Sequence, residues 1–349
     1  MTSLSKGCYN TFFSHIYIEK EILHHKNTQK ILRRFPGAEI VEISHYKDIF
    51  CRKGQNFFIQ KKCPCLILAK KNNSMIYEGA PVCQSFGNNH FYYTSSVMNC
   101  IYDCEYCYLQ GMYPSAHLVV FVNLEDIFLE VEKLLTLHPV YLCISYDTDL
   151  LAIDSALLYV KEWMEFCRKH KDLTIELRTK SSNWNTLNYT CKSYNENTPP
   201  QNFILAWTLS PSEFVKAYEK HTPPLEERIR CAVNAINAGY KVRLCFDPML
   251  YHKDWKSIYE NFIRTVFKQI NGEQLFDVSL GVFRISQEFL KQMRKQRMDS
   301  VILQYPYEND NGVYHYNKSL THEMIAYMEC LLGEHIPKNK VFVWKETTL

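Results

Sequence analysis

Three cysteines on one short segment are the residues in this sequence with the clearest potential for chemistry. Cys100, Cys104 and Cys107 follow the spacing C-x3-C-x2-C. Thiolates with this spacing on one loop can converge on a single inorganic centre. A structural zinc site normally adds a fourth nearby cysteine or histidine, and no such partner is evident locally. Three thiolates suit a cubane iron–sulfur cluster, which keeps one iron open for a substrate or cosubstrate.

The remaining cysteines give no such pattern. The sequence has 14 cysteines, and its first residues, MTSLSKGCYNTFF, lack the basic and apolar parts of a secretory signal. We therefore expect a cytoplasmic protein with reduced thiols rather than a disulfide framework. The pair Cys63 and Cys65 receives no role from the sequence. Isolated cysteines, which are typically small buried apolar residues, are Cys8, Cys51, Cys83, Cys143, Cys167, Cys191, Cys231, Cys245 and Cys330.

The elements that must position these residues alternate between extended apolar runs and helical patterns. Such alternation indicates parallel β/α units. About six units would form a doubly wound sheet or a partial barrel, with the chemistry at the carboxyl ends of the strands. The predicted strands are residues 118–122, 140–145, 174–179, 203–209, 241–246 and 278–283.

Local signals predict where several helices begin and end. Asn123 should cap a helix whose apolar face includes Ile127 and Val131. One helix is expected at about 155–170, and another should end at Gly239. The polar segment 181–200 is expected to be a long loop. Residues 1–88 differ in pattern and predict a smaller α/β segment before the main unit at 89–349, which ends in a C-terminal extension.

Composition excludes several classes of protein. The chain has 349 residues, 46% of them hydrophobic, and a formal net charge of +3. This balance excludes a highly basic protein that coats nucleic acid, although a local basic groove stays possible. No apolar run approaches the roughly 18–20 residues of a membrane-spanning helix, so we expect no membrane partner.

The cysteine triplet, with Tyr106 directly before its last cysteine, is identified as a signature of the radical S-adenosylmethionine superfamily. The string NCIYDCEYCYLQ and the following VVFVNLEDIF resemble the spore photoproduct lyase family of DNA-repair enzymes. Further similar segments are IYIEKEIL, YDTDLLAID, RTK, AGYKVRLCFDP and VFRIS with Arg284. The resemblance implies an α/β fold, namely a partial (β/α)6 barrel with the smaller N-terminal α/β segment in front of it.

The resemblance also implies a reaction. A [4Fe-4S] cluster on Cys100, Cys104 and Cys107 would reductively cleave S-adenosyl-L-methionine. The resulting 5′-deoxyadenosyl radical would abstract hydrogen from a thymine dimer in DNA and revert it to two thymines. The expected partners are DNA carrying this lesion and a reducing electron donor such as flavodoxin or ferredoxin.

Individual site residues follow from the same resemblance. Tyr106 and Tyr108 match two tyrosines proposed to relay a radical, and the Tyr108 ring could stack on adenine; shielding of the cluster is the alternative. Lys180 matches a lysine that faces the cosubstrate carboxylate. Thr208 and Asp247 match positions that could bind the ribose hydroxyls, or else cap the next helix or turn.

Tyr146 departs from the family pattern. It stands where repair-active lyases carry a cysteine that returns a hydrogen atom to the thymine radical. Cys143 lies three residues earlier, and strand alternation predicts that it faces the other way. Tyr146 itself could donate hydrogen, or the donor could be elsewhere, with Cys83 and Cys245 as candidates.

The substrate side departs from the pattern as well. Where the family has a basic-aromatic hairpin, this sequence reads YENDNGVYHY, and its acidic residues would repel phosphates. The basic stretch 291–297 is expected to form a solvated helix face. Two other functions stay open: the same radical chemistry on a modified nucleoside or peptide, and an inactive metal-binding module that binds nucleic acid.

Overall fold

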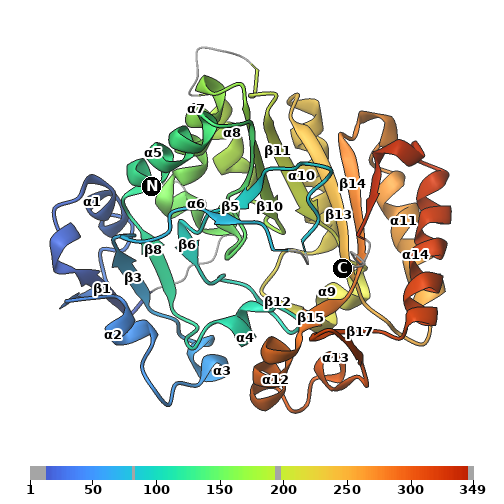
Figure 1. The fold of residues 1–349 in the computed structure, drawn as a ribbon, viewed down its shortest axis with the longest axis horizontal. Helices are drawn as coiled ribbons and strands as arrows, with labels where there is room; N and C mark the ends of the chain where they lie inside the picture. The colour runs from blue at the N-terminus through green and yellow to red at the C-terminus, as the bar shows by residue number, and fades with distance from the viewer. Residues whose placement is uncertain (1–12, 81–82, 193–197, 345–349) are drawn as a thin grey trace.

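The computed structural model describes residues 13–80, 83–192 and 198–344. Its largest sheet has eight strands in the order β18-β14-β13-β11-β10-β9-β5-β4 and curls around the centre of the molecule (Figure 1). All neighbours pair in parallel except β4 and β5. The strands are β4 (Tyr77–Glu78), β5 (Phe91–Tyr93), β9 (Val140–Cys143), β10 (Leu173–Thr179), β11 (Phe203–Thr208), β13 (Lys241–Met249), β14 (Asp277–Val282) and β18 (Val341–Val343).

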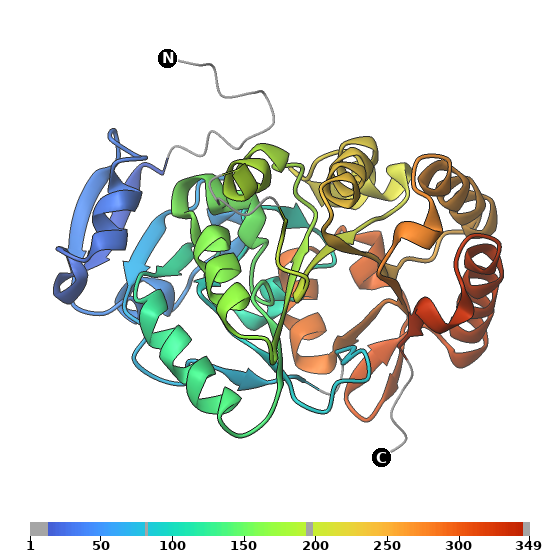
Figure 2. The same cartoon turned by 90° about the horizontal axis from the view of Figure 1, so that it is seen from above.

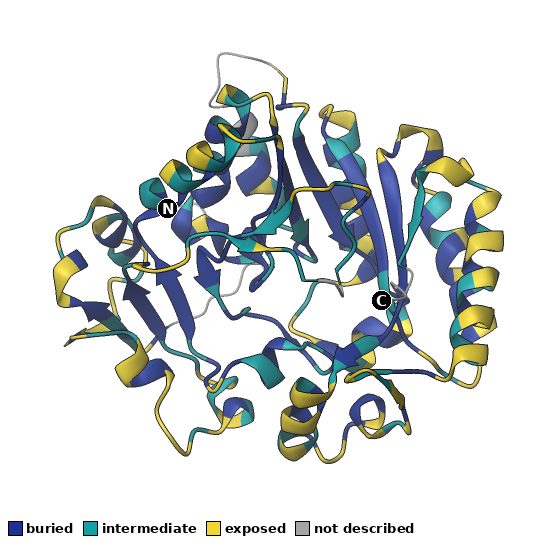
Figure 3. Cartoon of the chain, in the orientation of Figure 1, coloured by how far each residue is buried: buried dark blue, intermediate teal, exposed yellow. Residues whose placement is uncertain are grey.

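The strands at the centre of this sheet are apolar along their length because both of their faces are covered. Every residue of β9, β11 and β14 is buried. Helices pack on the outer side of the curl (Figure 2), and buried strands line the centre while exposed residues concentrate on the helices (Figure 3). The predicted partial barrel with a smaller N-terminal α/β segment is confirmed.

A second sheet has five strands in the order β2-β1-β3-β8-β6. The run at 118–122, expected as the first strand of the main series, is instead β8 of this sheet, where Leu118 pairs with Leu66. The fully buried strand β3 needs an apolar neighbour on each side, and β8 supplies one. The strands are β1 (His15–Glu19), β2 (Glu39–Ile43), β3 (Leu66–Ala69), β6 (Val97–Met98) and β8 (Leu118–Phe121).

The boundary predicted at residue 88 therefore does not separate the two sheets. Strand β8 lies beyond residue 88 but completes the smaller sheet, whereas β4 lies before it and forms the edge of the larger one. Two short sheets complete the fold: β7 (Asp103–Cys104) with β12 (Glu219–Lys220), and β15 (Arg284–Ser286) with β17 (Val313–His315) and β16 (Glu308–Asp310).

The helices agree with the sequence patterns in part. The helix expected at 155–170 is two helices, because Leu158 takes a left-handed conformation with φ 60° between them. The segment expected as a long loop contains α8. The helices are α1 (Lys26–Leu32), α2 (Lys47–Phe50), α3 (Phe57–Gln60), α4 (Leu109–Met112), α5 (Leu124–Leu135), α6 (Leu150–Leu157), α7 (Tyr159–Lys169), α8 (Trp184–Lys192), α9 (Ser212–Tyr218), α10 (Leu225–Asn237), α11 (Trp255–Phe267), α12 (Gln287–Gln296), α13 (Val301–Gln304) and α14 (Lys318–Gly333).

Two predicted helix ends have different outcomes. Gly239 follows the end of α10 with φ 83°, a conformation that glycine adopts without strain, as expected. Asn123 precedes α5, but its side-chain amide bonds the backbone N–H and C=O of Lys71 and the Asp126 carboxylate rather than a backbone N–H of the helix. It therefore ties α5 to the end of β3. In the described part of the chain, no helix has the length and apolar character needed to cross a bilayer.

Candidate active site

The three cysteines lie on the segment between β6 and α4, which includes the two-residue strand β7 (Figure 1). Asn99 opens this cysteine loop (residues 100–107) in a left-handed conformation with φ 67°. Its side-chain amide donates to the carbonyls of Ser115 at 2.6 Å and His117 at 2.8 Å. Because Asn tolerates this conformation and bonds locally, it fixes where the loop leaves the sheet.

Cys104 is buried, and Cys100 and Cys107 are partly buried. Burial raises the pKa of Cys100 and Cys104 to about 12 and that of Cys107 to about 11. Thiolates are the ligand form, so a bound group must supply positive charge to offset this cost. Among the residues that the structure describes, no group of three histidine, cysteine, aspartate or glutamate side chains is arranged to hold a single metal ion. A cubane distributes its thiolates over separate irons, so the donor set fits such a cluster.

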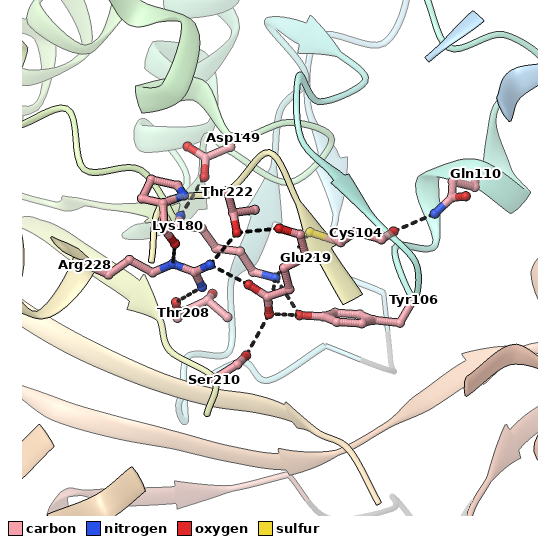
Figure 4. Close-up of polar contacts among 11 residues, drawn as sticks. Cys104, Tyr106, Gln110, Asp149, Lys180, Thr208, Ser210, Glu219, Thr222 and Arg228 are labelled. Carbon is pink, nitrogen blue, oxygen red and sulfur yellow. Dashed lines mark hydrogen bonds and ion pairs between the residues drawn. The ribbon is translucent and has the colours of Figure 1, made fainter. Parts of the chain in front are cut away.

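Lys180 connects the end of β10 to the cysteine loop. Its ammonium group donates to the Tyr106 hydroxyl oxygen at 2.6 Å and lies 3.0 Å from a Glu219 carboxylate oxygen and 3.6 Å from the Cys104 sulfur (Figure 4). Two of these three partners, Tyr106 and Cys104, belong to the predicted site. The third, Glu219, does not.

Glu219 is the centre of a buried polar network. One of its carboxylate oxygens accepts from Ser210 at 2.8 Å and from the Tyr106 hydroxyl, and the other pairs with Arg228 at 2.6 Å (Figure 4). The side chains of Glu219 and Arg228 have no exposed area. Burial alone would raise the pKa of Glu219, but the charges of Arg228 and Lys180 hold it well below the ordinary value. Glu219 is therefore an anion in the fold.

The structure places this network beside the cysteine loop through backbone pairing. Strand β12 carries Glu219 opposite Cys104 of β7 in an antiparallel register. The sequence carried no signal for this pair, because both strands have two residues and no periodicity. Only the three-dimensional arrangement brings residue 219 next to residue 104.

Asp149 bonds the residues at the end of β10 and fixes the position of that strand end. Its carboxylate accepts from the Lys180 backbone N–H and the Thr179 hydroxyl, both at 2.6 Å, and from Ala152 N–H at the start of α6. One side chain thus caps a helix and fixes the backbone of Lys180. Asp149 lies in the segment YDTDLLAID, for which the sequence predicted a site role only at Tyr146.

Thr208 and Asp247 lie on the next strands of the sheet, β11 and β13. Thr208 is buried, and its carbonyl accepts from Arg228 at 3.3 Å. The Asp247 carboxylate forms two contacts with the Arg284 guanidinium, at 3.1 and 3.2 Å. Asp247 thus enters an ion pair within the site rather than capping a helix.

Tyr108 and Tyr146 form a separate group from Tyr106. The Tyr108 hydroxyl donates to the Tyr146 carbonyl at 2.6 Å, and their rings lie 5.9 Å apart. The Tyr146 ring stacks on Tyr93 at 4.1 Å, and its hydroxyl oxygen lies 3.3 Å from the Cys83 sulfur. Of the two distant cysteines considered from the sequence, the structure therefore brings Cys83 to Tyr146.

Cys143 does not follow the alternation argument. Strand β9 ends at Cys143, so the period of two does not extend to Tyr146. Leu142 and Ile144 belong to the main core, whereas Cys143 lies near Glu176 and Arg178 inside the curl of the sheet. Burial raises the pKa of Cys143 to about 12. Cys245, also fully buried, lies near Arg178 as well.

Arg297 was expected on a solvated helix face, but it is only 3% exposed. Its guanidinium contacts the Asp103 carboxylate in the cysteine loop and donates to the Gln110 side-chain oxygen at 2.5 Å. Gln110 in turn donates to the Cys104 carbonyl at 2.6 Å. A Cβ on Gly111 would lie 2.4 Å from the Phe289 carbonyl oxygen, so α12 packs directly against α4. The C-terminal extension therefore holds the cysteine loop in place.

The acidic stretch near the C-terminus forms the hairpin β16–β17. Asp310 pairs with Lys318 at 3.0 Å and with His315 at 3.3 Å, so part of its charge is balanced by neighbouring side chains. Glu308 is exposed on the same strand. The repulsion expected between this segment and DNA phosphates is thus reduced at Asp310 but not at Glu308.

Comparison with known proteins identifies one family. The family model for spore photoproduct lyase matches residues 88–342. Curated spore photoproduct lyases include one from Clostridium acetobutylicum, 23% identical over 75% of this chain and 76% of its own length. The enzyme from Bacillus subtilis is 21% identical over 93% of this chain and 96% of its own.

Solved structures share the fold at lower identity. A spore photoproduct lyase complexed with dinucleoside spore photoproduct has a TM-score of 0.80 and 17% identity, covering 95% of this chain and 98% of that chain. A spore photoproduct lyase mutant with bound AdoMet and dinucleoside spore photoproduct has a TM-score of 0.79 and 18% identity, covering 96% of this chain and 98% of that chain.

Proposed function

Because this chain belongs to the spore photoproduct lyase family, we propose that it is a radical S-adenosylmethionine lyase that reverts a thymine dimer in DNA to two thymines. The observation that carries the proposal is the position of Lys180, whose ammonium group lies within reach of both Tyr106 and the Cys104 sulfur. A strand-end cation beside the cysteine loop is suited to a cosubstrate carboxylate. Reduced thiols are consistent with work in the cytoplasm.

Each site residue has a role in this proposal. Cys100, Cys104 and Cys107 would hold a [4Fe-4S] cluster, which supplies the electron that cleaves S-adenosylmethionine. Lys180 pairs with the methionyl carboxylate, and Glu219 keeps the Lys180 side chain in position through its 3.0 Å contact. The residues assigned to the nucleoside part are Tyr108 at the adenine and Thr208 and Asp247 at the ribose.

In this proposal the hydrogen atom returned to the thymine radical comes through Tyr146. The Tyr146 O–H bond breaks as the new thymine C–H bond forms, and the Cys83 thiol, 3.3 Å away, restores the phenol by giving up its own hydrogen atom. 5′-Deoxyadenosine, the other product of hydrogen abstraction, would return a hydrogen atom to the cysteine radical, which leaves the cycle without any additional oxidant or reductant. Burial raises the pKa of Cys83, which keeps the S–H intact.

This route predicts a specific defect. Cys83→Ala should leave S-adenosylmethionine cleavage in place but lower the thymine yield by about tenfold or more, the size of effect expected for a positioned transfer group. Because the Tyr146 hydroxyl and the Cys83 thiol both exchange with D2O, Cys83→Ala should limit deuterium entry into thymine to a single turnover. Tyr146→Phe should lower the thymine yield as well and abolish deuterium entry altogether. The matched control is Cys245→Ala, which should behave like the unchanged protein; a loss of deuterium transfer there would move the donor to Cys245.

The function itself is tested by turnover of a synthetic dinucleoside spore photoproduct after anaerobic reconstitution with iron and sulfide. We expect two thymines and reductive cleavage of S-adenosylmethionine in the same sample. Cleavage without lesion repair would favour a different substrate, a modified nucleoside or a peptide, which the tyrosine at 146 and the acidic hairpin would then explain. Failure to form any cluster would support a metal-binding module without catalysis.

A further inference from the structure

The proposed reaction needs an electron, and the far side of the cysteine loop offers a surface through which it could enter. Phe58 of α3 is half-buried there. Its ring centroid lies 5.3 Å from the Lys62 ammonium and 5.1 Å from the Arg297 guanidinium carbon. We refer to the surface formed by Phe58, Lys61 and Lys62, with the buried Arg297 against the Phe58 ring, as the entry face.

The entry face lies one side chain from the cysteine loop. The Lys61 ammonium contacts the Cys100 carbonyl, and the Arg297 guanidinium contacts the Asp103 carboxylate. Lys180, at the end of β10, contacts the loop at the Cys104 sulfur instead. The residue proposed to bind S-adenosylmethionine and the entry face therefore contact the loop at different cysteines.

The surface around the entry face combines exposed apolar side chains with cations. Ile59 is 62% exposed, Met298 80% and Val301 74%, and all three lie on the segments that contribute Phe58 and Arg297. Lys62, Lys291 and Lys295 are exposed on the same segments, where Glu288 and Asp299 are the exposed acidic residues. An apolar centre with a charged rim is typical of a protein interface rather than of a surface that contacts only phosphates.

We propose that the entry face docks an acidic one-electron carrier protein of the flavodoxin or ferredoxin class. The reduced flavin or iron–sulfur centre of that protein loses one electron, and the cluster held by Cys100, Cys104 and Cys107 gains it. Cations at the rim steer an acidic partner and fix its orientation. This inference rests on the proposed function, because only a redox cluster would need such a partner.

The first test is binding. Oxidised bacterial flavodoxin is titrated into the chain at low and moderate salt, and the dissociation constant is read from flavin fluorescence. Lys62→Glu should raise it about tenfold at low salt, since the change reverses a rim charge. Met298→Glu, on a highly exposed residue, should weaken binding as well. The matched control is Lys268→Glu at the end of α11, which should have no effect.

The second test compares electron sources. With reduced flavodoxin, Lys62→Glu should slow S-adenosylmethionine cleavage, whereas with dithionite, a small reductant that needs no docking, it should not. The inference would be overturned if Lys62→Glu and Met298→Glu bound flavodoxin as tightly as the unchanged protein does. It would also be overturned if these variants bound duplex DNA more weakly while their flavodoxin binding stayed the same. If dithionite drives no S-adenosylmethionine cleavage in any sample, the proposed function fails. The binding titration still tests whether flavodoxin docks on the entry face.

Discussion

Replacing Cys104 with serine should abolish cluster assembly and, with it, all cleavage of S-adenosylmethionine. Cys104 is the cysteine within reach of Lys180, and it lies on the short strand that pairs with Glu219. Without its thiolate, two irons of a cubane would have no protein ligand. We expect the iron content after reconstitution to fall near background and activity to fall by more than about 100-fold, since even changes outside the ligand set can cost 10–100-fold.

The control for this change is Cys63→Ser. Cys63 is exposed and is not part of the cysteine loop, so its substitution should leave iron content and visible absorbance unaltered. Iron analysis and absorbance spectra before and after dithionite provide the measurement. A Cys104→Ser protein with normal iron and normal spectra would refute the cluster assignment, as would a tightly held zinc that iron does not replace.

Replacing Glu219 with glutamine should destabilise the fold by about 3–5 kcal/mol, because it removes one partner of a fully buried ion pair. Arg228 would keep its charge without the carboxylate 2.6 Å away. Lys180 and Tyr106 would lose the same charged acceptor. We therefore expect weaker S-adenosylmethionine binding in addition to a lower midpoint in urea unfolding.

A matched control separates burial from the loss of a negative charge. Glu226→Gln changes an exposed glutamate seven residues further along, in the first turn of α10, and should shift stability by no more than about 0.5 kcal/mol. Glu219→Gln combined with Arg228→Met removes both charges and should recover part of the loss. A cost below about 1 kcal/mol for Glu219→Gln alone would show that the network does not hold the site together.

Local sequence patterns predicted most elements because they are visible within a short window. The buried strands β9, β11 and β14 read as largely apolar runs, β10 and β13 contain shorter apolar stretches, and the triplet of cysteines identified its own loop. The partners of that loop could not be predicted in this way. Glu219 and Arg297 lie far along the chain from the residues they contact, and each resembles an ordinary charged surface residue until the fold buries it.

Three features were predicted wrongly or could not be placed, because each depends on contacts or backbone angles that a short sequence window does not show. An apolar run specifies a buried strand but not which sheet it joins, so β8 was assigned to the wrong one. Leu158 interrupts a helix with a backbone angle that its residue type rarely adopts. Cys83 could be listed as a hydrogen donor but not placed, because its contact with Tyr146 spans 63 residues.

The link between Asp103 and Arg297 also fixes the order of events while the protein is being made. These residues are 194 positions apart, so the cysteine loop emerges from the ribosome long before its C-terminal support. At roughly 5–20 residues per second, the interval is about 10–40 s. During that time three thiols are present on a nascent chain without Arg297 to hold their loop. Iron and sulfide can therefore be received in the finished geometry only after nearly the whole polypeptide has been synthesised.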